Sequence, residues 1–127
     1  MKELTRAEEQ VMQVLWKLGR AFVKDVIDEL PEPKPAYNTV STIVRILEKK
    51  GFVGHKAFGN SHEYHPLMSK DEYKKKFFKS FLNRFFGNSF PEMVSFFAGG
   101  RDLSLGELEE IQTRLRQEIE KQKGGKS

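Results

Sequence analysis

Within its first 66 residues the chain changes from helical spacing of apolar side chains to two strand-like segments. Three short segments, at about Thr5–Leu18, Val23–Leu30 and Asn38–Lys50, carry apolar residues every three or four positions, and glycine or proline follows each of them. The segments Phe52–Phe58 and Ser61–His65 then flank a Gly-Asn pair, which favours a β-hairpin. Three helices followed by a hairpin predict a winged helix-turn-helix domain.

The composition changes near Pro66–Ser69, and helical patterns alone follow. We expect helices at about Lys70–Phe86, Pro91–Phe97 and Leu105–Lys123, with a break at the two glycines that follow the middle one. The predicted fold class is therefore mainly α with a small β-hairpin. The predicted domains are a winged helix-turn-helix over residues 1–68 and a helical dimerisation domain over residues 69–127.

The segment Asn38–Lys50 has two chemically different faces. Its apolar residues fall on one side of a helix, whereas short polar residues and long cations gather on the opposite side, and Glu48 lies off that polar stripe. Hydrogen-bonding groups with cations and no carboxylate suit base edges and phosphates in a DNA major groove. We predict DNA contacts from this helix and the hairpin by Asn38, Thr39, Ser41, Thr42, Arg45, Lys49 and Lys56, although Lys56 can equally be an ordinary exposed lysine.

Aromatic residues are concentrated in the second half of the chain. Eight of the eleven phenylalanines lie between Phe77 and Phe97, more than a short helical segment readily buries within itself. Burial against a second copy of the chain explains them better than an internal core does. The predicted dimer contacts are Phe77, Phe78, Phe81 and Phe85, with an apolar stripe of Leu108, Ile111, Leu115 and Ile119 on the last helix.

Several runs of residues resemble the penicillinase repressor family, also called BlaI/MecI/CopY. The most specific are Leu4–Met12 with Leu15-Trp16, Tyr37–Ile43, Leu47–Val53 and the hairpin end Tyr64–Pro66. The second half matches only in its helical layout and in Asp102-Leu103-Ser104. The resemblance implies a homodimeric repressor of transcription that binds a palindromic double-stranded operator, commonly of genes for β-lactam resistance or copper handling.

In the β-lactam branch, the resemblance also implies relief of repression by proteolysis. A membrane-bound sensor zinc protease leads to cleavage of the repressor between its C-terminal helices. Alignment on Asp102-Leu103-Ser104 puts the corresponding bond at Phe96-Phe97, where the family pattern has Asn before the cut and this chain has Phe96. The copper branch carries a C-terminal cysteine motif, and the absence of cysteine here excludes metal sensing by that route.

Composition argues against several other classes of protein. Without cysteine there is no disulfide, thiolate metal site or cysteine nucleophile. His62 and His65 stand three apart in a strand and should point to opposite faces, so with His55 they are not expected to form a metal site. No nucleophile–base set or glycine-rich phosphate loop indicates an enzyme, and no cofactor is expected.

The charge and hydropathy patterns suit a cytoplasmic DNA-binding protein. The net charge of +4 is compatible with nucleic acid, and no apolar run is long enough for a membrane span or a signal peptide. We therefore expect no direct membrane association. The alternative function is a winged helix that contacts only other proteins, but such a surface usually offers an apolar or aromatic anchor, whereas the polar stripe offers none.

Overall fold

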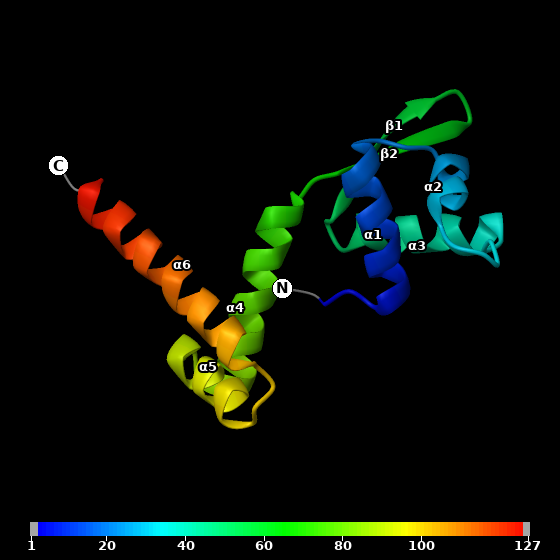
Figure 1. Cartoon of the computed structure of the whole chain (residues 1–127). Helices are drawn as coiled ribbons and strands as arrows, with labels where there is room; N and C mark the ends of the chain where they lie inside the picture. The colour runs from blue at the N-terminus through cyan, green and yellow to red at the C-terminus, as the bar shows by residue number, and fades with distance from the viewer. Residues whose placement is uncertain (1–2, 126–127) are drawn as a thin grey trace. The chain divides into compact units, whose positions relative to one another are not determined.

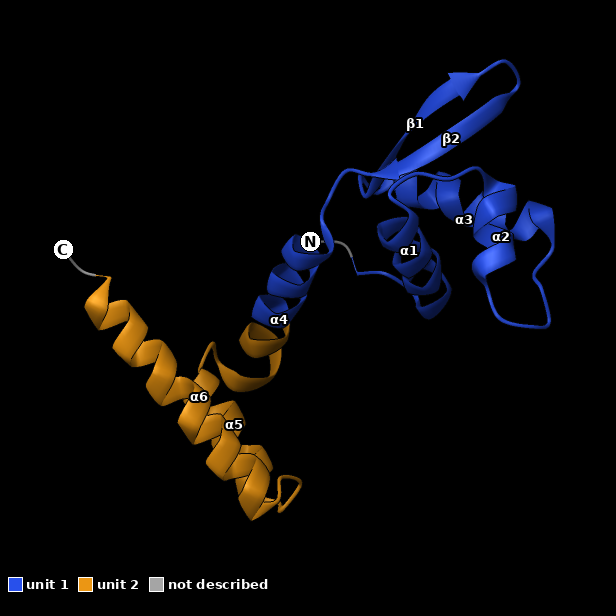
Figure 2. Cartoon of the chain, turned by 45° about the horizontal axis from the view of Figure 1, so that its top comes forward, with its two compact units in different colours: residues 1–80 blue, residues 81–127 orange. Residues whose placement is uncertain are grey.

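The computed structural model describes residues 3–125 and has six helices and one two-stranded antiparallel sheet within them. This confirms the predicted fold class. The chain forms two compact units, residues 1–80 and residues 81–127, and the boundary between them falls inside helix α4, Lys70–Phe86 (Figure 2). The domain boundary predicted between residues 68 and 69 stays a prediction.

The first unit begins with three helices, α1 (Arg6–Leu18), α2 (Val23–Glu29) and α3 (Tyr37–Lys49) (Figure 1). A capping box starts α1: the Glu8 backbone N–H donates to Thr5 Oγ1 at 3.2 Å, and the Thr5 N–H donates to Glu8 Oε1 at 3.0 Å. All three helices lie within one or two residues of their predicted bounds, because local capping and breaking residues set their ends.

The hairpin consists of β1 (Val53–Phe58) and β2 (Ser61–Pro66). Val53 pairs with Pro66 and Phe58 with Ser61, so Gly59-Asn60 is a two-residue turn. Gly59 has a φ of 60°, the left-handed value that a type II′ turn requires at its first central position. The predicted hairpin is thus confirmed with its predicted turn.

A third chain segment joins the hairpin at a single residue. Ala21, between α1 and α2, pairs antiparallel with Tyr64, and the two backbone hydrogen bonds measure 2.9 and 2.8 Å. One bridging residue has no periodicity that a sequence pattern could reveal. This bridge attaches the base of the hairpin to the helices.

The hydrophobic core lies between the three helices, the base of the hairpin and the first turn of α4. Trp16 Nε1 donates to the Met68 carbonyl at 2.9 Å, and the Trp16 ring lies 5.5 Å from that of Tyr73. These contacts attach the start of α4 to α1 within the first unit. The buried core residues are Val11, Met12, Val14, Leu15, Ala21, Val23, Val26, Leu30, Val40, Val44, Leu47, Phe52, Val53, Tyr64 and Tyr73.

The second unit contains the end of α4, α5 (Phe90–Gly99) and α6 (Leu105–Gly124). The predicted break at the two glycines is confirmed: α5 ends at Gly99 with Gly100 as its C-cap, and Arg101 follows with a φ of 61°. The Phe86 ring packs against the rings of Phe96 and Phe97, at 5.7 and 6.5 Å between centroids.

This second unit has no fully buried side chain among its described residues, 81–125. Figures 1 and 2 both show the C-terminal half of α6 extending away from α5. A unit of this kind leaves its apolar stripe in contact with solvent when the chain is alone.

Candidate nucleic-acid interface

Helix α3 is oriented by its apolar face. Val40, Val44 and Leu47 are at most 1% exposed, and Ile43 packs against them from the edge of the core. Because these residues point inward, the opposite stripe points outward. Of the predicted DNA-contacting residues on α3, Ser41 is half-buried and the others are exposed: Asn38, Thr39, Thr42, Arg45 and Lys49.

The exposed side chains of this stripe are connected by local hydrogen bonds. Thr42 Oγ1 donates to the Asn38 carbonyl at 2.9 Å, and Arg45 Nε donates to the Ser41 carbonyl at 3.3 Å. One terminal nitrogen of Arg45 also lies 3.5 Å from Thr42 Oγ1. The Arg45 guanidinium is therefore held along the polar stripe, next to two hydroxyl-bearing side chains.

The single carboxylate of α3 is directed to the hairpin. Glu48 Oε2 lies 2.5 Å from His55 Nδ1 on β1, and each of the two side chains is about one-third exposed. The His55 ring stacks on that of His62, with 4.1 Å between centroids and 10° between planes. No sequence pattern points to this contact, because it depends on how α3 packs beside the hairpin.

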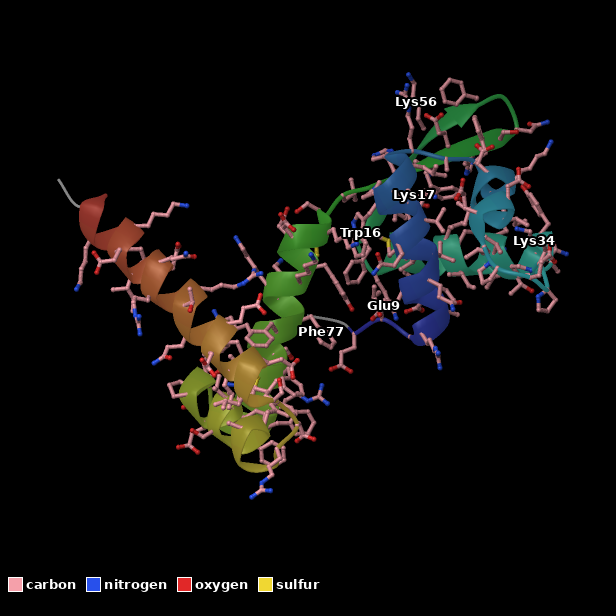
Figure 3. The ribbon with its side chains drawn as sticks, viewed as in Figure 1. Glu9, Trp16, Lys17, Lys34, Lys56 and Phe77 are labelled. Atoms are coloured by element: carbon pink, nitrogen blue, oxygen red, sulfur yellow. The ribbon has the colours of Figure 1, made fainter. Side chains whose placement is uncertain are left out.

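Lys56 is exposed on the hairpin (Figure 3). Its Nζ lies 5.3 Å from the centre of the Phe58 ring, and Glu63 is its cross-strand partner. Alternation along the strands puts Lys56 on the face opposite His55. Among the residues predicted to contact DNA, Lys56 is the one that lies outside α3.

Apolar and aromatic side chains flank the polar stripe, which the sequence pattern did not reveal. Tyr37 at the start of α3 is 59% exposed, and Ile46 is 39% exposed. Tyr37 also borders an open groove of about 450 Å³ between the starts of α2 and α3 and the hairpin turn. This groove is lined by Phe22, Val23, Lys24, Asp25, Tyr37, Phe58, Ser61 and His62.

The three histidines are not brought together. His55 and His62 share one face of the hairpin, whereas His65 pairs with Gly54 and lies on the other face, as the strand alternation predicted. Within residues 3–125, no three histidine, aspartate or glutamate side chains are arranged to hold a metal ion. Nor does that part of the chain contain a helix long and apolar enough to cross a membrane.

The predicted dimer contacts and the predicted cleavage bond lie on the later helices. None of the eight dimer residues is fully buried, and Phe77, Phe78, Phe85, Leu115 and Ile119 are exposed. The Phe96-Phe97 bond lies inside α5 and not in a connection between helices. The carbonyl of Phe96 accepts from the Gly100 N–H, and that of Phe97 from the Asp102 N–H, both at 3.1 Å.

The sequence of this chain is similar to those of known proteins. A family model described as "Penicillinase repressor" matches residues 4–117. The chain is 31% identical to the methicillin resistance regulatory protein MecI of Staphylococcus aureus (strain N315) over 114 residues, which cover 89% of this chain and 93% of that protein. It is 32% identical to a penicillinase repressor of Bacillus licheniformis over 110 residues, 86% of each chain.

Two solved structures are also similar to part of the chain. The DNA-binding domain of the repressor BlaI superposes with a TM-score of 0.49 and 31% identity, over 57% of this chain and 94% of that one. The CopR repressor superposes with a TM-score of 0.44 and 33% identity, over 54% of this chain and 100% of that one. On the match of the family model to most of its length, this chain belongs to the penicillinase repressor family of transcriptional repressors.

Proposed function

We propose that this protein is a homodimeric transcriptional repressor that reads a palindromic double-stranded operator with α3. The observation that carries the proposal is the outward stripe of α3, which combines hydroxyl, amide and cationic groups while its one carboxylate is directed to His55. Membership of the penicillinase repressor family supports the same function.

Each predicted contact has a chemical role in this proposal. Arg45 suits the two acceptors on a guanine edge, and Asn38 suits the donor and acceptor of adenine. Thr39, Ser41 and Thr42 can bond to base edges or phosphates, whereas Lys49 and Lys56 suit phosphates, which position the protein without reading sequence.

The second unit is the proposed dimerisation element. Its described residues include no fully buried side chain, and a second copy would cover the exposed apolar residues of α4 and α6. Two α3 helices joined in this way match operator half-sites that lie about one turn of the DNA double helix apart, or a multiple of that distance. Joining them also raises affinity, because the second half-site is met at high effective concentration.

The relatives' names support a resistance operon as the regulated target, and the resemblance to the β-lactam branch of the family is the ground for proposing proteolysis as the route of relief. In this proposal the protein acts in the cytoplasm, and a membrane-bound sensor zinc protease starts the signal. Cleavage at Phe96-Phe97 would require the end of α5 to unfold locally, because the carbonyls of both residues accept helical or capping hydrogen bonds. Removal of α6 would then weaken the dimer.

A second candidate function is a winged helix that contacts only proteins. The groove beside Tyr37 and the exposure of Phe58 favour it, since aromatic side chains are common anchors of protein interfaces.

Recovery of bound DNA from a random duplex library distinguishes the two functions. We expect a palindromic sequence to be enriched, and Arg45→Ala to weaken binding to it by about 1–3 kcal/mol. Arg116→Ala, which changes an exposed arginine of α6, is the matched control. No enrichment of any sequence, with the fold intact, would favour the protein-binding alternative.

A further inference from the structure

Two basic residues could pair with Glu48, Arg45 on the same helix and His55 on the hairpin, and its carboxylate contacts His55. Glu48 is the single acidic residue of α3 and follows Arg45 by three positions, a spacing at which opposite charges normally attract on a helix. Here its carboxylate contacts His55 on β1, while Arg45 donates to Ser41 and Thr42. The hairpin thus competes with Arg45 for Glu48.

The hairpin holds the His55 ring in place for this contact. His62 stacks against one side of the ring, and the Tyr64 ring lies 5.8 Å away. Burial and the Glu48 carboxylate raise the pKa of Tyr64, while Arg45 acts in the opposite direction, so the side chains of Glu48 and Arg45 both lie near this face of the hairpin. A stacked imidazole loses little rotational freedom when it binds a carboxylate.

A carboxylate left on the reading face would oppose DNA binding in two ways. It would pair with the Arg45 guanidinium, which would then have to break that pair before bonding a base. It would also repel the phosphates, since unit charges a few ångströms apart interact appreciably near a protein surface.

We propose that His55 is a positioning residue for DNA binding, which keeps Glu48 against the hairpin and thereby leaves Arg45 oriented along the polar stripe. This inference rests on the proposed function, because it assumes that α3 reads DNA. Neither the polar stripe nor the hairpin alone would keep the Glu48 carboxylate from pairing with the Arg45 guanidinium. This separation requires Glu48 at the edge of α3 and a stacked histidine opposite it.

The test compares five full-length variants, Arg45→Ala among them, on the DNA recovered from the duplex library, by fluorescence anisotropy at one fixed salt concentration. His55→Ala should weaken binding by about three- to tenfold, because Glu48 returns to Arg45 and faces the phosphates. Glu48→Gln should bind at least as tightly as the natural chain. The double variant H55A/E48Q should recover the affinity lost in His55→Ala, since the competing carboxylate is gone. His65→Ala is the control, because it removes a histidine from the other face of the hairpin.

The pattern of results separates this inference from the proposed function. If Arg45→Ala weakens binding but His55→Ala does not, His55 has no positioning role, and the proposal that α3 reads DNA is retained. If Glu48→Gln weakens binding as much as His55→Ala, or the double variant fails to recover, the contact serves the fold alone and the inference is overturned. If no variant, Arg45→Ala included, changes affinity, α3 does not read DNA and both ideas fail. Thermal unfolding of each variant confirms that it is folded, as expected for side chains about one-third exposed.

Discussion

Lys50 Nζ lies 2.7 Å from Glu8 Oε1, which joins the end of α3 to the first turn of α1 across 42 positions of sequence. Glu8 is only 5% exposed, and it also completes the capping box with Thr5. Burial acts to raise the pKa of this carboxyl, but the Lys50 ammonium and the Thr5 hydrogen bonds outweigh it and hold the pKa below its usual 4.5. The C-terminal end of α3 is therefore fastened to α1 by a charged pair.

Glu8→Gln should destabilise the protein by about 1–3 kcal/mol at neutral pH, because it weakens the cap and removes the carboxylate partner of Lys50, whose Nζ then keeps the Glu3 carbonyl as an acceptor. The pKa is lower in the folded chain, so the contribution of the carboxylate is present above pH 4.5 and is lost as the pH falls through the folded value. Urea unfolding at a series of pH values should show the difference from the natural chain shrinking below pH 4.5. Glu120→Gln, on the exposed surface of α6, should show no such pattern.

Tyr73 should remain protonated in the folded protein well above the usual range. Burial, and then the Glu9 carboxylate to which its hydroxyl donates at 3.4 Å, raise its pKa from 10 to about 12. Stability should decline as the pH rises from 10 towards 12, because the unfolded chain loses this proton first. The absorbance titration of Tyr73→Phe, subtracted from that of the natural chain, gives the ionisation curve of the Tyr73 phenol alone. A midpoint of that curve near pH 10 would contradict the expectation.

A chain ending at Phe96 should lose both dimerisation and tight operator binding. It lacks α6 and the last residues of α5 but keeps every predicted DNA contact, so a loss of affinity would come from the second unit and not from the reading helix. Operator affinity should fall by roughly 100-fold. Sedimentation and operator binding measure the two effects, with a chain ending at Glu120 as the control that retains the apolar stripe. Leu115→Glu in the full chain should act in the same direction, and continued dimerisation of both altered chains would rule out α6 as the interface.

Lys49→Ala should weaken binding to all DNA sequences alike. If Lys49 contacts a phosphate, its loss reduces the number of counterions released, and the slope of log affinity against log salt should decrease by about 0.9. Arg45→Ala, by contrast, should relax the preference for one base pair. A salt titration of both variants on operator and unrelated DNA separates the roles, with Lys121→Ala as a control on α6. A loss confined to the operator would show that Lys49 reads a base.

Local structure followed closely from the sequence. Helix α4 occupies Lys70–Phe86, as predicted, because Ser69 caps its start and Gly87 adopts a positive φ at its end. The inward face of α3 and the turn at Gly59-Asn60 were predictable for the same reason: each depends on residues a few positions apart. The residues proposed to contact DNA and to form the dimer remain predictions.

Tertiary structure decided which distant residues meet. The Ala21–Tyr64 bridge, the Glu8–Lys50 pair and the Glu48–His55 contact each join different elements. No spacing encodes them, because they arise only when the buried faces of α1, α3 and the hairpin pack into one core and bring the polar edges together. The sequence therefore determined that α3 has a polar outward face, whereas packing decided that its one carboxylate contacts His55 on the hairpin.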